Sequence, residues 1–246
     1  MNSNVKAIKI LNTPQNAVLS KMGLLNVNDT KVVHLLNTYN LALANSNQEY
    51  YRLLAKSEYN FVDGKLLQVT LSKVFRVRIS QVRGIDLMKS ILFASPNGLN
   101  HLFICPNDLN SDCLKEKIAE IYPLLESEFI VPPFLNDIET LTKEISNKIG
   151  TRKFDYIWVG IGTPKQDFLA QELSNFTDGA YIICIGAALD FLAGTKKEAP
   201  RFFQNMGLEW LFRFIQEPRR LFKRYFIKSW GFFLIIIRGK IEIETQ

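Results

Sequence analysis

Cysteine and histidine are scarce in this sequence, which limits the chemistry it can support. Its 246 residues include three cysteines, with no CxxC pair, and two histidines. An odd number of cysteines leaves at least one thiol unpaired, so we expect Cys105, Cys113 and Cys184 to be buried free thiols, as in a protein of the reducing cytoplasm. With only His34 and His101 available, a metal site built from several imidazoles is disfavoured.

Long apolar runs are also missing. No stretch reaches the roughly 20 apolar residues that a membrane-spanning helix needs, and the longest, residues 230–237, is flanked by Lys228 and Arg238. The first ten residues, MNSNVKAIKI, lack the apolar core of a signal peptide. Hydrophobic residues make up 47% and charged residues 22%, which excludes a disordered or collagen-like chain and fits one large domain with or without an appendage.

Excess positive charge is confined to the C-terminal fifth of the chain. Residues 196–246 hold 11 Lys and Arg against 5 Asp and Glu, whereas the remainder holds 19 residues of each sign. This asymmetry indicates an anionic partner for the C-terminal segment: a phosphate group, a nucleic acid or an acidic membrane surface.

Short apolar runs alternate with amphipathic stretches through the middle of the chain. The pattern predicts strands over residues 31–36, 59–62, 101–105, 128–131, 154–162 and 180–185. It predicts helices over residues 37–55, 112–125, 137–149 and 164–173. Strands that alternate with helices favour an α/β fold with a mostly parallel sheet covered by helices on both faces.

Capping residues and composition mark the boundaries of these parts. We expect Ser111 or Asp112 to cap one helix, and Thr163 to cap another with Pro164 at its first position. The first 30 residues are polar and Asn-rich, and they predict an irregular lead-in. From about residue 200 the alternation stops, which divides the chain into a core, residues 1–199, and a helical basic appendage, residues 200–246, broken near Glu217-Pro218.

A glycine-rich turn follows the predicted strand at residues 154–162. Gly160 and Gly162 would let a ligand approach the backbone, and Pro164, Lys165 and Gln166 begin a helix whose free N–H groups attract anions such as phosphate. A tight strand-to-helix turn without any ligand explains the same residues, because the string matches neither GxGxxG nor a Walker A sequence.

Two aspartates follow other predicted strands. Asp63, before Gly64, is placed as a general base at the carboxyl end of a strand, although Asp-Gly is also a common turn. Asp190 follows the small residues after the strand at 180–185, and it could bind a ligand or cap a helix. Ligands of parallel α/β folds bind outside the carboxyl ends of the strands, where both aspartates would lie.

Basic and aromatic residues interleave in the appendage. Arg213, Arg220, Lys223 and Arg224 recur at helical spacing. A solvated helix face, a nucleic-acid contact and a membrane-surface helix with Arg and Lys on lipid phosphates all fit this pattern. The absence of a nucleic-acid-binding motif and the abundance of Phe, Leu and Ile disfavour nucleic acid.

Two long strings resemble the WecG/TagA/CpsF family of bacterial glycosyltransferases. They are VGIGTPKQDFLAQEL and GAALDFLAGTKKEAPRFFQNMGLEWLFRFIQEPRRLFKRY. Upstream, VVHLLNTYNLALANSNQEYYRLLAKSEYNFVDGKLL is similar to the family's N-terminal block and VRGIDLM to its middle motif. The resemblance covers roughly residues 31–225.

The resemblance implies an inverting transferase with no metal or other cofactor. It would move an N-acetylmannosamine-type sugar, or its uronic acid, from UDP to an undecaprenyl-diphosphate-linked sugar in teichoic acid, capsule or enterobacterial common antigen synthesis. The implied protein has a Rossmann-like domain and an appendage that closes over the active site, peripheral to the cytoplasmic face of the inner membrane. A non-catalytic sugar-nucleotide-binding or scaffold subunit is the alternative, and homo-oligomerisation stays open.

The resemblance also implies roles for individual residues. Asp63 matches the family's general base, Gln166 a contact to the donor sugar or diphosphate, and Asn37 a residue near the donor pocket. The basic residues that match those of the family's appendage, and that would stabilise the departing UDP and the lipid diphosphate, are Arg213, Arg220 and Lys223 or Arg224.

Two positions depart from the family pattern. Asp167 stands where the family usually has Glu after the Pro-Lys-Gln string. Residues 105–108, Cys-Pro-Asn-Asp, stand where the family usually has a glycine-rich turn, which argues against a phosphate contact in that loop.

Overall fold

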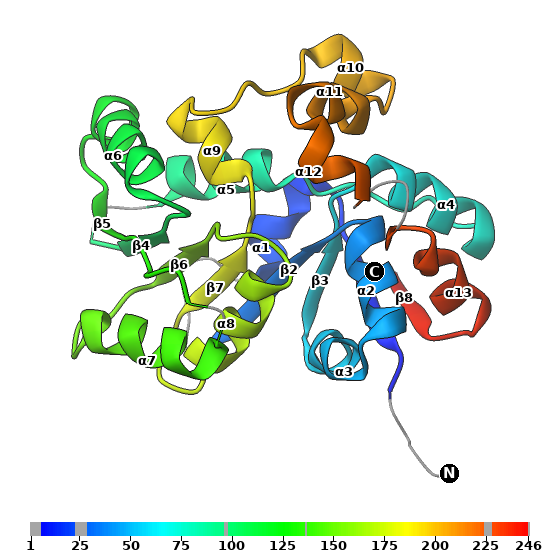
Figure 1. Cartoon of the computed structure of the whole chain (residues 1–246), viewed down its shortest axis with the longest axis horizontal. Coiled ribbons are helices and arrows are strands. Elements are labelled where there is room, and N and C mark those ends of the chain that lie inside the picture. The colour runs from blue at the N-terminus through cyan, green and yellow to red at the C-terminus, as the bar shows by residue number, and fades with distance from the viewer. Residues whose placement is uncertain (1–5, 23–28, 96–97, 136, 224–227, 246) are drawn as a thin grey trace. The chain divides into compact units, whose positions relative to one another are not determined.

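The computed structural model divides into two compact units, each assembled from several segments of the chain (Figure 1). Unit 1 comprises Met1–Thr13, Leu36–Gln81 and Lys197–Gln246, and unit 2 comprises Pro14–Leu35 and Val82–Lys196. Within them the structure describes residues 6–22, 29–95, 98–135, 137–223 and 228–245.

A six-stranded sheet has the strand order β3-β2-β7-β6-β4-β5. Its strands are β2 (Lys31–Leu36), β3 (Tyr59–Val62), β4 (Asn100–Ile104), β5 (Glu126–Ile130), β6 (Tyr156–Val159) and β7 (Tyr181–Cys184). Every pairing whose register is described is parallel. The predicted α/β fold with a parallel sheet is therefore confirmed, although the strand order is not the 3-2-1-4-5-6 of dinucleotide-binding domains.

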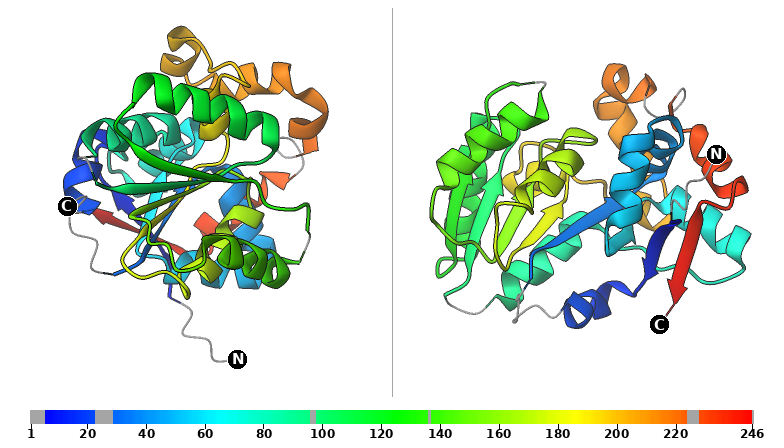
Figure 2. Two further views of the ribbon diagram at one scale, coloured as in Figure 1. Left: turned by 90° about the vertical axis from the view of Figure 1, so that its left-hand side faces the viewer. Right: turned by 90° about the horizontal axis from the view of Figure 1, so that it is seen from below.

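Helices cover both faces of the sheet in unit 2, as predicted (Figures 1 and 2). One layer holds α5 (Gly84–Ala94), α6 (Asp108–Ile121) and α9 (Ala188–Ala193), in which α9 contacts both α5 and α6. The other holds α7 (Ile138–Ile149) and α8 (Lys165–Leu173), which contact each other. The fully buried side chains between the sheet and α7 and α8 include Leu102, Ile157, Leu169 and Ile182. Burial on both sides explains why these strands read as continuous apolar runs.

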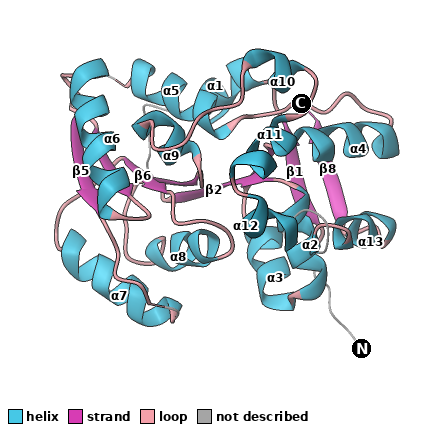
Figure 3. Cartoon of the chain, turned by 45° about the horizontal axis from the view of Figure 1, so that its top comes forward, coloured by secondary structure: helices cyan, strands magenta, loops and turns pink. Residues whose placement is uncertain are grey.

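In unit 1, the N-terminal segment is ordered, and the expectation of an irregular lead-in is wrong for part of it. Strand β1 (Ile8–Asn12) pairs in parallel with β8 (Ile241–Thr245) from the other end of the chain (Figure 3). Ile8 and Ile10 are fully buried, and this alternation holds β1 in place. A short 3-10 helix (Gln15–Ala17) and α1 (Val18–Met22) follow in unit 2.

The remaining helices of unit 1 are short. They are α2 (Thr38–Ser46), α3 (Gln48–Lys56), α4 (Lys65–Phe75), α10 (Arg201–Asn205), α11 (Glu209–Gln216), α12 (Pro218–Phe222) and α13 (Gly231–Ile237). The predicted break at Glu217-Pro218 is confirmed, because Glu217 caps α12. The wholly helical appendage is not, because the chain ends in β8. None of the described helices is long and apolar enough to cross a membrane.

Side-chain caps shift several predicted helix boundaries. The single helix predicted over residues 37–55 is two helices, because Asn47 caps α3 by accepting from the Tyr50 N–H at 3.0 Å. Helix α6 starts earlier than predicted, because its cap is Asn107 and neither Ser111 nor Asp112. At α8 the cap position is Pro164 and not Thr163, and the peptide bond between them is cis.

Candidate functional site

Gly160 directly follows β6 in unit 2 and is required for packing. A Cβ at this position would lie 2.4 Å from Leu189 Cδ1 and 3.2 Å from the Gly186 carbonyl oxygen. Real Cβ atoms do not approach so closely, so the glycine lets α9 and the turn after β7 press against the end of β6. The packing explanation of this glycine therefore has direct support.

Gly162, two residues later, is not constrained by packing. Its φ of +90° is a conformation that favours glycine, and a Cβ there would meet no atom within 4 Å. The Gly162 N–H donates to the Gln166 Oε1 at 3.1 Å, and the Gln166 N–H donates to the Gly162 carbonyl at 2.9 Å. The turn is thus open on one side and held on the other by Gln166, whose side chain is only 4% exposed.

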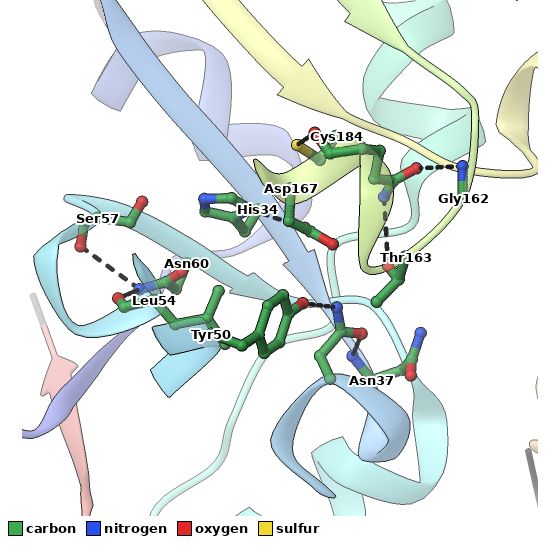
Figure 4. Close-up of polar contacts among 12 residues, drawn as sticks. His34, Asn37, Tyr50, Leu54, Ser57, Asn60, Gly162, Thr163, Asp167 and Cys184 are labelled. Carbon is green, nitrogen blue, oxygen red and sulfur yellow. Dashed lines mark hydrogen bonds and ion pairs between the residues drawn. The ribbon is translucent and has the colours of Figure 1, made fainter. Parts of the chain in front are cut away.

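The first turn of α8 presents opposite charges in different surroundings. The Lys165 ammonium lies 5.4 Å from the ring centre of Phe134, which is 94% exposed. The Asp167 carboxylate is buried, and its Oδ1 lies 2.9 Å from Nδ1 of buried His34 (Figure 4). Lys165 is therefore the charged group of this turn that remains available to a ligand. Pro164, which precedes it, is half-buried at the cap position.

His34, Asp167 and Cys184 form a buried cluster that the sequence did not reveal. One ligand-type atom from each lies within 4.8 Å of the others, a donor set that a divalent cation could use. However, His34 and Asp167 use their facing atoms in their own hydrogen bond, and the Cys184 thiol donates to the Gln166 carbonyl at 3.6 Å. Burial, followed by the nearby Asp167 charge, raises the pKa of Cys184 well above its usual value. In the structure the cluster is therefore a hydrogen-bonded core network.

Asp190 lies in α9 with its carboxylate engaged by neighbouring side chains of unit 2. Its Oδ2 accepts from the Lys196 ammonium at 3.0 Å, and its Oδ1 accepts from the Asn110 amide at 3.2 Å. The Thr195 hydroxyl lies 3.5 Å from the same Oδ1. These contacts tie α9 to α6, so a ligand would have to share the carboxylate with three protein donors.

The cysteines are all free, as predicted, but not all buried. Cys105 and Cys184 are buried, whereas Cys113 on α6 is partly exposed. Burial raises the pKa of Cys105 to about 12. In the Cys-Pro-Asn-Asp turn, the Asn107 side chain caps α6 by accepting from the Asn110 N–H at 2.9 Å.

In unit 1, Asp63 and Gly64 follow β3 and are fixed by their backbone. Both of their N–H groups donate to the Leu36 carbonyl, at 2.8 and 3.3 Å, and the Gln81 side-chain amide donates to the Asp63 carbonyl. A Cβ on Gly64 would lie 3.0 Å from the Asn37 Cβ, so these two predicted site residues are in direct contact. Asn37 itself caps α2, accepting from the Tyr39 N–H at 2.9 Å.

The appendage contacts the residue that follows this Asp-Gly turn. Gly207, between α10 and α11, has a φ of +71°, and a Cβ there would lie 2.8 Å from the Lys65 Cγ. Arg213 is partly exposed on α11 and Lys223 is exposed after α12. Arg220 belongs to α12, but its side chain lies outside the described part of the chain, as does all of Arg224.

Large apolar side chains of the appendage face solvent. None of the eight residues of α11 is fully buried. Six of these large apolar side chains are between 38% and 78% exposed: Phe202, Trp210, Ile215, Phe222, Trp230 and Ile237. Apolar side chains alternate along this segment with the basic residues named above, a composition that is common in surfaces that contact a partner.

Eight of the predicted site residues therefore form two local groups, and Asp190 and the basic residues of the appendage lie outside them. Asn37, Asp63 and Gly64 lie together in unit 1, and Gly160, Gly162, Pro164, Lys165 and Gln166 form one turn in unit 2. A family model described as "Glycosyl transferase WecG/TagA/CpsF family" matches residues 4–246, which is nearly the whole chain.

Proposed function

Because the chain belongs to the WecG/TagA/CpsF family of glycosyltransferases, we propose that it transfers an N-acetylmannosamine-type sugar from UDP to an undecaprenyl-diphosphate-linked acceptor. The product would enter the synthesis of a cell-surface polysaccharide. The observation that carries this proposal is the Asp63-Gly64 turn, which is pinned to the Leu36 carbonyl beside Asn37. It places an aspartate with a fixed backbone directly after a strand's carboxyl end.

Asp63 is the proposed general base. Its carboxylate takes the proton from the acceptor hydroxyl while the hydroxyl oxygen forms a bond to the anomeric carbon of the donor sugar. The bond between that carbon and the diphosphate oxygen breaks, and UDP leaves with the electron pair. A single displacement of this kind inverts the configuration at the anomeric carbon.

The glycine turn of unit 2 is the proposed contact for the donor diphosphate. Gly162 leaves the backbone open at the start of α8, where N–H groups and the helix dipole favour a negatively charged group. Lys165 adds a positive charge in the first helical turn, whereas the Asp167 carboxylate is buried against His34 and does not face solvent. Gln166 keeps the turn in this conformation.

The basic residues of the appendage are the proposed stabilisers of the leaving group. Charge-assisted hydrogen bonds from Arg213, Arg220 and Lys223 or Arg224 would balance the charge that develops on UDP without a metal. The close packing of Gly207 against Lys65 supports this assignment, since it holds the appendage next to the residues that follow Asp63.

The exposed apolar side chains of the appendage are the proposed membrane contact. Aromatic and aliphatic groups would enter the headgroup boundary while Arg and Lys meet anionic phosphates. The lipid-linked acceptor would then be reached from the cytoplasmic face of the membrane, with the enzyme bound peripherally.

A donor screen and an Asp63 variant test the proposal together. The protein is incubated with lipid-diphosphate-GlcNAc and a panel of UDP-sugars in the presence of EDTA, and UDP release and product mass are followed. A product from one donor would identify the sugar and the metal requirement. No product from any donor, with UDP binding intact, would favour the non-catalytic sugar-nucleotide-binding alternative.

We expect Asp63→Asn to keep UDP binding and to lose about 10²- to 10⁴-fold in kcat, the usual contribution of a general base. Asp178→Asn is the control, because Asp178 is exposed and precedes β7 at the amino end of that strand. Turnover by Asp63→Asn at the wild-type rate would remove Asp63 from the mechanism.

A further inference from the structure

Unit 2 contains a network of polar side chains in its buried core, where polar groups without partners lower the stability of the fold. His34, Asp167, Gln166 and Cys184 are at most 4% exposed. Atoms His34 Nε2 and Asp167 Oδ2 have no hydrogen-bond partner among the described residues. A purely structural core would favour apolar side chains here, because buried polar groups without partners cost about 1–3 kcal/mol each.

The contacts of this network converge on the first turn of α8. From β2, the His34 Nδ1 lies 2.9 Å from the Asp167 Oδ1, and from β7 the Cys184 thiol reaches the Gln166 carbonyl (Figure 4). Gln166 in turn accepts from the Gly162 N–H at 3.1 Å, and its amide nitrogen lies 3.5 Å from the Thr163 hydroxyl. Strands β2 and β7 are therefore linked through α8 to the glycine turn.

We propose that His34 is a positioning residue for donor binding: through Asp167 it fixes the first turn of α8 and so holds the Gln166 carboxamide that keeps the Gly162 turn open. This inference rests on the proposed function, in which the turn receives the donor diphosphate. His34 is fully buried, so it acts through Asp167 and Gln166 and not by touching the donor.

His101 provides a matched control. It is also fully buried in the same sheet, where its Nδ1 accepts from the Trp158 indole N–H at 3.2 Å. It pairs in register with Tyr156, at the amino end of β6 and away from the glycine turn. Substitution of either histidine removes one buried imidazole, but only substitution of His34 removes the contact with Asp167 in α8.

Amide hydrogen exchange of Gly162 tests the positioning without any ligand. His34→Leu keeps the side-chain volume and removes the N–H donor, whereas His34→Asn places an amide nitrogen where Nδ1 stood but fills less space. We expect the Gly162 amide to exchange about tenfold faster in His34→Leu, and at the wild-type rate in His34→Asn and His101→Leu. Faster exchange in His34→Asn but not in His34→Leu would show that packing alone matters, and would overturn the proposal.

UDP binding by calorimetry tests the consequence for the donor. We expect Kd to rise about tenfold in His34→Leu with the His101→Leu value unchanged, and the double variant His34→Leu/Gln166→Ala to bind no more weakly than Gln166→Ala. Additive losses would show that His34 does not act through Gln166. In a transfer assay, His34→Leu should raise KM for the UDP-sugar more than it lowers kcat.

Two outcomes separate this inference from the proposed function. If the wild-type protein binds no UDP, the proposed function fails, and the exchange rates still decide whether His34 holds the turn. If His34→Leu does not fold, His34→Gln replaces it, because the longer side chain carries its nitrogen to the Nε2 position. Protection of Gly162 in His34→Asn and its loss in His34→Gln would support the proposal, and equal protection in both would refute it.

Discussion

Substituting Gly160 by alanine should destabilise unit 2 through one identified contact. The added Cβ would lie 2.4 Å from Leu189 Cδ1 and 2.8 Å from its Cγ, and Leu189 is fully buried in α9. Neither the leucine nor the end of β6 can yield without disturbing the core. Overpacking of this kind costs about 1–3 kcal/mol of unfolding free energy.

Tryptophan fluorescence can follow this loss in unit 2 alone. Trp158 is fully buried in β6, whereas Trp210 and Trp230 belong to unit 1. In a Trp210→Phe/Trp230→Phe background, urea unfolding followed by Trp158 reports the unit that contains Gly160. With an m-value of about 2–3 kcal/mol/M, we expect Gly160→Ala to lower the midpoint by roughly 0.3–1.5 M.

Leu189→Ala provides the decisive second variant. Alone it should cost about 2–5 kcal/mol, because it leaves a cavity. Combined with Gly160→Ala it removes the clash, so the double variant should be about as stable as Leu189→Ala. The two substitutions would then show a favourable coupling of about 1–3 kcal/mol. Strictly additive losses would refute the packing explanation of Gly160.

Three further predictions concern other parts of the molecule. Ile215→Glu should weaken pelleting with anionic vesicles about tenfold, because it removes an exposed apolar contact, while Leu124→Glu, an equally exposed site in unit 2, should not. Burial lowers the pKa of His101 to about 4. Unfolding therefore takes up a proton as the pH falls below about 6.5, and between pH 6.5 and 4 the wild type should lose about 3 kcal/mol more stability than His101→Phe, measured by urea unfolding. A thiol reagent at pH 7.5 should modify only Cys113 in the folded protein, as read by mass spectrometry.

The sequence predicted the sheet well because most of its strands are buried on both faces. The predicted strands Lys31–Leu36 and Tyr59–Val62 have the bounds of β2 and β3. A short apolar run between turn residues is typical of a buried strand. Helix starts were less predictable, because Asn107 and not Ser111 or Asp112 caps α6, by accepting from the Asn110 N–H. Several capping residues stood close together in the sequence, and only the backbone conformation decides among them.

Pairing between distant segments could not be predicted from local patterns. β1 reads as an ordinary polar-apolar alternation, and its partner β8 lies more than 200 residues away, so neither segment signals the other. His34 and Asp167 are likewise 133 residues apart. A single histidine in an apolar strand gives no indication of its partner, and the carboxylate of Asp167 reads as a normal first-turn residue of a helix.

Gly160 and Gly162 lie in the same turn, but each position needs glycine for a different reason. The sequence offered phosphate binding and a tight turn as competing explanations of both glycines. In the structure Gly160 has no room for a Cβ, whereas Gly162 has room but adopts a φ of +90°. Substitution of Gly160 therefore acts on stability through Leu189, and substitution of Gly162 acts on the backbone conformation that Gln166 holds. Gly160 is packed against α9 where the turn begins, whereas Gly162 leaves one side of the turn open.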